Sequence, residues 1–127
     1  MPLVRIDLQK GKDPVFRAGI GKVVYDALRD QAGAPEDDRF QIISEHDPDN
    51  FIYDPNYLGI MRTADLVMIQ IIFVQGRTLD QKKALYKAIA DGLSSSLGMR
   101  REDVFICLVE VAKENWSFGN GVAQYAP

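Results

Sequence analysis

Apolar and polar residues along the first half of the chain follow two different periods in turn. Residues 3–8 alternate between apolar and polar positions, which is typical of a half-buried strand. Asp13 then has the position of a helix N-cap with Pro14 at the first helical position, and apolar residues recur at helical spacing as far as Gly33. Residues 40–45 predict a second strand. The first half is therefore expected to fold as strand, helix and strand.

The second half repeats this order. Residues 66–74 are apolar on both faces of the expected strand apart from Gln70, a pattern that favours a strand covered above and below. The next helix begins with Thr78 and Gln81, which have the spacing of a capping box. Residues 104–111 predict the closing strand.

A shift of 65 positions aligns the two halves without a gap, which indicates an internal duplication. Repeat 1 covers about residues 2–45 and repeat 2 about residues 66–111, within one domain of residues 1–127. Residues 46–64, a linker, and residues 112–127, a glycine-containing aromatic tail expected to form a small hairpin, fall outside the repeat. The nine identical pairs are Ile6/Ile71, Gly11/Gly76, Lys22/Lys87, Asp26/Asp91, Leu28/Leu93, Gly33/Gly98, Asp38/Asp103, Phe40/Phe105 and Glu45/Glu110.

Two such units predict an α+β fold with a four-stranded mixed sheet and both helices on one face. Each strand–helix–strand unit normally returns parallel to its first strand through a right-handed crossover. Two helices cover only one side of the sheet, yet residues 66–74 are apolar on both sides. We therefore expect further copies of the chain to cover the second face.

Composition narrows the possible functions. The 127 residues are 46% hydrophobic, which is enough for one core, and no stretch resembles a membrane span or a signal peptide. We therefore expect a soluble, cytoplasmic protein without a membrane partner, and the net charge of −3 argues against nucleic acid. The chain has one histidine, His46, and one cysteine, Cys107, which argues against a zinc site and against a Ser-His-Asp triad. Cys107 lies in an apolar run and is expected to be a buried thiol.

Pro2 is the main candidate for acid–base chemistry. The duplication pairs it with Val67, inside an apolar strand, so Pro2 should stand at the head of a sheet strand. Removal of Met1 would expose a secondary amine, and burial or a cation such as Arg77 would lower its pKa toward that of a neutral base. The alternative is that a Met-Pro start has no functional meaning.

Three motifs together resemble the tautomerase superfamily. They are Met1-Pro2 opening a strand, the Gly76-Arg77 segment entering a helix, and Trp116-Ser-Phe-Gly-Asn-Gly near the end of the chain. Each half looks like one short 4-oxalocrotonate tautomerase subunit, and the whole is similar to fused members such as malonate semialdehyde decarboxylase. The resemblance implies a homotrimer, a pocket with proline at its floor, and no cofactor.

The resemblance also suggests roles for individual residues. Pro2 matches the catalytic proline, Arg77 the arginine that binds a substrate carboxylate, and Asp38 the aspartate that activates water or acts on the proline. Gln75 is an accessory polar group that stands where the decarboxylase has the first of two arginines. Three residues match the aromatic wall of the pocket: Trp116, Phe118 and Tyr125.

The sequence thus predicts a cofactor-free tautomerase of a small 2-oxo acid, with Pro2 as general base and Arg77 as carboxylate anchor. One alternative is a decarboxylase or hydratase that uses Pro2 and Asp38, and another is a non-enzymatic interaction protein on the same trimer. Structural interpretations remain open as well. Arg77 could be a solvated charge at the start of a helix, Asp38 could bind backbone groups as its repeat partner Asp103 could, and the aromatic residues could pack an interface.

Overall fold

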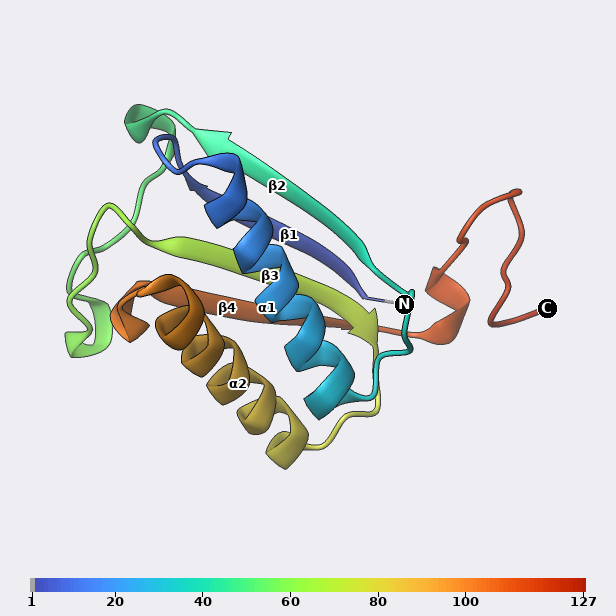
Figure 1. Ribbon diagram of the computed structural model, residues 1–127. Helices are drawn as coiled ribbons and strands as arrows, with labels where there is room; N and C mark the ends of the chain where they lie inside the picture. The colour runs from blue at the N-terminus through green and yellow to red at the C-terminus, as the bar shows by residue number, and fades with distance from the viewer. Residues whose placement is uncertain (1) are drawn as a thin grey trace.

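The computed structural model describes residues 2–127, so Met1, whose removal the Pro2 amine requires, lies outside the described residues. Figure 1 shows a sheet with two helices packed on one of its faces. The elements, in chain order, are β1 (Leu3–Gln9), α1 (Pro14–Ala32), β2 (Phe40–His46), β3 (Val67–Val74), α2 (Leu79–Leu97) and β4 (Val104–Val111).

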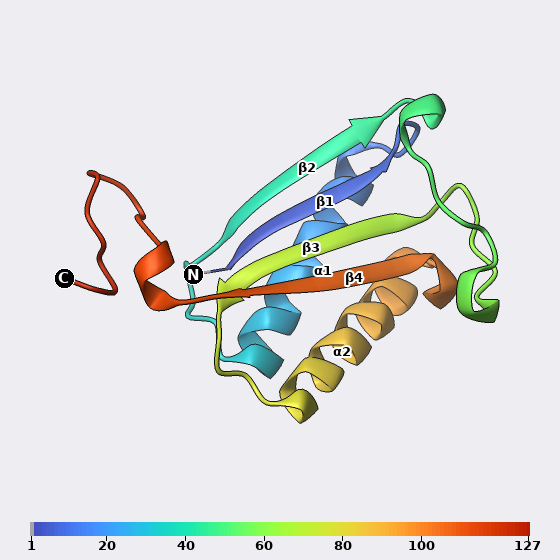
Figure 2. The same ribbon diagram turned by 180° about the vertical axis from the view of Figure 1, so that it is seen from behind.

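The strands lie in the order β2-β1-β3-β4. β1 pairs parallel with β2 and antiparallel with β3, and β3 pairs parallel with β4. The predicted four-stranded mixed sheet with both helices on one face is therefore confirmed. Figure 2, seen from behind, shows that no helix covers the other face of the sheet.

Local helix signals explain where both helices begin and end. Asp13 accepts a hydrogen bond from the N–H of Phe16 (2.8 Å), and Thr78 forms the expected capping box. Gly33 and Gly98 end the helices in the left-handed conformation, with φ of 69° and 66°. The two helices are related at both ends by the same shift of 65 residues.

Matching 3₁₀ turns follow the last strand of each repeat. A 3₁₀ turn at Pro48–Asn50 follows β2, and another at Lys113–Asn115 follows β4, 65 residues later. Each turn ends in asparagine and is followed by an aromatic residue, Phe51 or Trp116. The linker and the tail therefore begin in the same way. They leave the sheet at opposite ends (Figure 2).

The tail folds back on itself without forming the expected β-hairpin. Residues 112–127 contain no strand, and three successive residues, Gly119, Asn120 and Gly121, have positive φ. The side chain of Gln124 closes this turn, because it accepts from the N–H of Phe118 and donates to the carbonyl oxygen of Gly119, both at 2.9 Å. Side-chain hydrogen bonds thus replace strand pairing.

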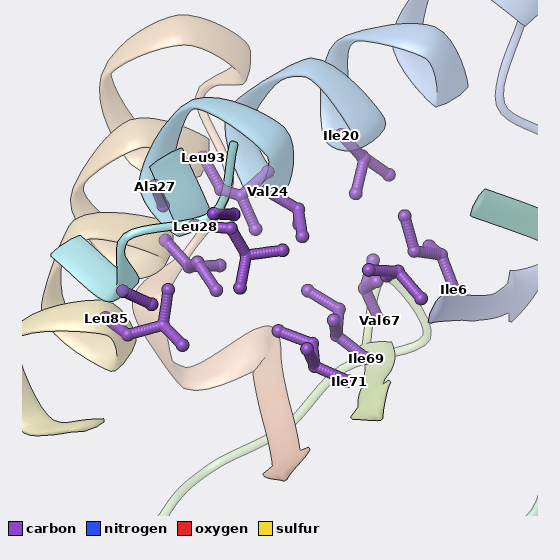
Figure 3. Close-up of a cluster of buried hydrophobic side chains, with 14 of the residues drawn as sticks. Ile6, Ile20, Val24, Ala27, Leu28, Val67, Ile69, Ile71, Leu85 and Leu93 are labelled. Atoms are coloured by element: carbon purple, nitrogen blue, oxygen red, sulfur yellow. The ribbon is translucent and has the colours of Figure 1, made fainter. Parts of the chain in front are cut away.

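The core lies between the helices and the sheet (Figure 3). Side chains such as Ile6 of β1, Ile69 of β3, Ile20 of α1 and Leu93 of α2 are almost completely buried. The two helices approach closely at Gly92, where a Cβ atom would lie only 2.7 Å from the Cγ1 atom of Val23. Neither described helix combines the length and the apolar character needed to cross a bilayer.

The face of the sheet that turns away from the helices is largely apolar. Phe40, Ile42 and Phe105 on this face are 56%, 44% and 44% exposed. Cys107 lies on the same face and is exposed, so the expectation of a buried thiol is wrong for the single chain. The reason is strand alternation, since Ile106 and Leu108 turn toward the core and Cys107 turns the other way.

Candidate functional site

Pro2 is buried immediately before β1 and lines a pocket of about 200 Å³. We call this the Pro2 pocket; its lining residues are Pro2, Leu3, Phe40, Trp116, Ser117 and Phe118. The small, mostly apolar lining suits a ligand with few non-hydrogen atoms.

Strand pairing explains why these distant segments meet. Because β1 runs antiparallel to β3, the start of β1 lies beside the end of β3, and the parallel partner strands bring the start of β2 and the end of β4 to the same place. Figure 1 shows the start of β1 at the end of the sheet from which the tail departs. The loop after Val74 leaves the sheet at this end too.

The tail supplies an aromatic wall. The rings of Trp116 and Phe118 stack with centroids 5.4 Å apart, and Tyr125 meets Phe118 edge-on at 4.8 Å. The indole Nε1 of Trp116 is buried and has no hydrogen-bond acceptor in the described chain. A buried donor of this kind costs free energy unless another group satisfies it.

A second pocket, of about 260 Å³, adjoins the first. It contains Asp38 and Tyr125, and it shares Phe40 and Phe118 with the Pro2 pocket. The chain at the border of this pocket is held at Asp37, which has a φ of 62° and donates its N–H to the hydroxyl of Tyr25 (3.2 Å). Five of the predicted site residues thus come together in these two pockets: Pro2, Asp38, Trp116, Phe118 and Tyr125.

Phe40 is one of the lining residues that the sequence analysis did not propose. It belongs to both pockets, and it opens β2. Two signals could have pointed to it, namely its identity with Phe105 in the repeat and its place two residues after the candidate Asp38.

Arg77 and Gln75 are not among the residues that line either pocket. Arg77 is half-buried, and its guanidinium lies 4.3 Å from the centroid of the Phe73 ring. Its Nε donates to the carbonyl oxygen of Ala32 (3.0 Å) and its Nη1 to that of Val74 (2.7 Å). Ala32 ends α1, so Arg77 places a positive charge at a helix C-terminus. Burial lowers the pKa of Arg77, although the guanidinium remains charged.

The loop that carries Gln75 and Arg77 is fixed by Glu110 of β4. The carboxylate of Glu110 accepts from the N–H of Gly76 (3.3 Å) and contacts the ammonium group of Lys82. The hydrogen bond from Lys82 holds the pKa of Glu110 below its ordinary value. The backbone N–H of Gln75 also donates to the carbonyl oxygen of Val111 (2.9 Å), so two neighbouring residues of β4 hold this loop.

Asp38 and Asp103 share a position in the repeat but not an environment. Asp103 is 1% exposed and accepts from the N–H (2.7 Å) and the hydroxyl (2.6 Å) of Thr63. The same Oδ2 atom that accepts from the hydroxyl also contacts Nη1 of Arg100 (3.5 Å). Asp38 is only partly buried and borders the pocket that adjoins Pro2. The backbone-binding role considered for this pair is seen at Asp103, which accepts from the N–H of Thr63.

Known proteins resemble the chain over nearly its whole length. Residues 38–119 match a family model described as tautomerase enzyme, and residues 2–61 match a second model with the same description. The chain is 44% identical over 124 residues to the probable tautomerase YusQ of Bacillus subtilis (strain 168), covering 98% of each sequence.

Two solved structures are also similar. FG41 malonate semialdehyde decarboxylase, inhibited by 3-bromopropiolate, has 39% sequence identity and a TM-score of 0.90, over 97% of this chain and 93% of that one. A fused 4-OT described as a symmetric trimer has 26% identity and a TM-score of 0.78, over 94% of each chain. The fold, the pocket and these matches agree, and the chain belongs to the tautomerase superfamily, a family of enzymes.

The repeat partners Asp103 and Asp38 should respond differently to the same substitution. Asp103→Asn places an amide donor against the donors of Thr63 in a buried site, so we expect it to lower the free energy of unfolding by about 1–3 kcal/mol. Asp38→Asn, at a partly buried position beside a pocket, should lower it by less, by about 0.5 kcal/mol. Urea unfolding of both variants measures the difference. Equal losses would show that Asp38 has a structural role like that of Asp103.

Proposed function

We propose that the protein is a cofactor-free tautomerase that interconverts the enol and keto forms of a small 2-oxo acid, with Pro2 as general base. The observation that carries this proposal is the placement of Pro2 in a small, mostly apolar pocket walled by stacked aromatic rings. Membership of a tautomerase family supports it. No observation favours the non-enzymatic alternative.

The proposed reaction needs one group that both takes and returns a proton. Once Met1 is removed, Pro2 has a secondary amine, and its burial disfavours the charged form and lowers its pKa. The neutral amine takes the proton from the enol hydroxyl, and the resulting cation returns a proton to the neighbouring carbon. No proton is gained or lost overall, and no oxidant or reductant is required.

Two groups are proposed to hold the substrate. The indole N–H of Trp116, buried without an acceptor in the described chain, donates to an oxygen of the 2-oxo acid. Arg77 is the proposed carboxylate anchor, because its loop lies at the same end of the sheet as Pro2 and its Nη2 has no hydrogen-bond partner in the described chain. Gln75, next but one to Arg77, is proposed as an accessory polar group.

Decarboxylation or hydration is the second candidate function. Its support is the similarity to a malonate semialdehyde decarboxylase and the position of Asp38, whose pocket shares Phe40 and Phe118 with the Pro2 pocket. In that case a protonated Pro2 polarises the carbonyl group, and Asp38 positions a water molecule. We rank it second because Gln75 replaces an arginine that the resemblance associates with decarboxylation.

The proposed functional unit is a homotrimer in which the exposed apolar face of the sheet is buried. A similar fused 4-OT is described as a symmetric trimer, and large apolar side chains on a bare face favour association.

Blocking the Pro2 amine should abolish turnover without unfolding the protein. A form that retains Met1, verified by mass spectrometry, has an amide at this nitrogen and therefore no basic lone pair. We expect ketonisation of phenylenolpyruvate, followed by absorbance, to fall to the uncatalysed rate, whereas circular dichroism remains unchanged. Equal rates for the blocked and free forms would exclude Pro2 as the base.

Gln75, in place of an arginine, leads us to expect tautomerisation to be faster than decarboxylation. We expect the wild type to ketonise phenylenolpyruvate with a higher kcat/KM than it decarboxylates malonate semialdehyde, because proton transfer needs only one carboxylate anchor. Arg77→Ala should reduce kcat/KM for ketonisation by the equivalent of about 1.5–3 kcal/mol. Lys12→Ala, at the matching repeat position, is the control and should leave it unchanged. Faster decarboxylation than ketonisation would reverse the ranking.

The trimer can be tested by sedimentation equilibrium. We expect three chains per particle at micromolar concentration. Ile42→Asp puts a charge on the bare face and should produce monomers, whereas Val15→Asp, at an 81% exposed position of α1, should not. A monomeric wild type would contradict the proposal.

A further inference from the structure

A third pocket, of about 230 Å³, lies at the opposite end of the sheet from Pro2. It is formed between the linker and the starts of β3 and β4, and we call it the linker pocket. Figure 2 shows the linker and the tail at the two ends of the same sheet. The linker pocket therefore shares no lining residue with the Pro2 pocket.

The linker pocket is the repeat counterpart of the Pro2 pocket. Four of the six residues that line the Pro2 pocket have a partner 65 positions away that lines the linker pocket: Leu3/Met68, Phe40/Phe105, Ser117/Ile52 and Phe118/Tyr53. The duplication has thus placed a similar apolar enclosure at each end of the sheet.

The two pockets differ in the position that supplies the base. Val67 occupies the place of Pro2 in the repeat, within β3, and its side chain is buried in the core. The nitrogen of Val67 is a peptide amide inside the chain and has no basic lone pair. Proton transfer of the kind proposed for Pro2 therefore has no counterpart in the linker pocket.

The linker pocket has a cation that the Pro2 pocket lacks. Arg62 lines it, and its Nη1 donates to the carbonyl oxygens of Tyr57 (3.0 Å) and Ile60 (3.3 Å), with a longer contact to that of Asp54 (3.5 Å). These bonds hold the linker closed. Nε and Nη2 of Arg62 make no hydrogen bond within residues 2–127, so this edge of the guanidinium remains available for a ligand.

The remaining lining residues define what such a ligand resembles. Tyr53, Tyr57 and Phe105 present aromatic rings, which suit a flat apolar body. Asp54 also lines the pocket, and its carboxylate accepts from the N–H of Asn56 (2.8 Å). This fixed negative charge opposes a second anionic group on the ligand.

We infer that the linker pocket is a non-catalytic binding site for a small monocarboxylate with a flat apolar body, whose carboxylate pairs with Arg62. The site is separate from the chemistry at Pro2 and does not depend on it.

Calorimetric titration of the Met1-free protein with cinnamate tests this inference. Cinnamate has one carboxylate and a flat aromatic body and carries no transferable enol proton. We expect two cinnamate molecules bound per chain. Ile52→Trp fills the linker pocket from an exposed position and should remove one of them while ketonisation of phenylenolpyruvate continues. Ser117→Trp, the matched change 65 residues later, should remove the other and stop turnover.

Charge is tested by a separate variant. Arg62→Gln should weaken binding at the linker pocket at least tenfold, and a dicarboxylate such as phthalate should bind there at least tenfold more weakly than cinnamate. Circular dichroism verifies that each variant is folded. If Arg62→Gln does not fold, the result for Ile52→Trp alone decides whether the linker pocket binds cinnamate.

Two outcomes would overturn the inference. In the first, the wild type binds one cinnamate per chain and Ile52→Trp does not remove it. In the second, Ile52→Trp dissociates the oligomer, which would identify a second copy of the chain as the occupant of the pocket. A protein that binds two cinnamates but lacks turnover would retain this inference and reject the proposed tautomerase.

Discussion

The antiparallel pairing of β1 with β3 is the interaction on which the rest of the molecule depends. Both strands are central, and each has its own parallel partner on its outer side. Since the two strands point in opposite directions, the start of each lies at the end of the other. Each end of the sheet therefore receives the beginning of one repeat together with the closing segment of the other repeat. That arrangement carries the tail to Pro2 and the linker to the start of β3, and it accounts for the pockets at both ends.

Features controlled by neighbouring residues could be predicted from the sequence, whereas features controlled by distant ones could not. The helix ends were predictable because caps such as Asp13 and Thr78 act within one turn. The contacts of Arg77 were not, since one of its acceptors, the carbonyl oxygen of Ala32, lies 45 residues away in sequence. The tail was misjudged for a related reason: aromatic residues and glycines suggested paired strands, but the side chain of Gln124 supplies the hydrogen bonds.

Repetition of a residue did not predict repetition of its role. Asp38 and Asp103 are identical partners in the repeat, yet Asp103 is buried against Thr63 and Asp38 borders a pocket. Phe40 and Phe105 changed less, since both line a pocket at their own end of the sheet. Apolar residues tolerate small changes in surroundings because their contribution depends mainly on buried area. Charged residues depend on individual partners, so the same aspartate has different surroundings in the two halves.

The tight contact at Gly92 bears on how far that divergence can proceed. The Cγ1 atom of Val23 occupies the space into which a larger side chain at position 92 would have to project, so any such residue would force Val23 or a helix to shift. The close approach of the two helices therefore requires a residue without a side chain at this point. Loops and charges at the two ends of the sheet are under no such restriction, so the halves can differ there while position 92 remains glycine.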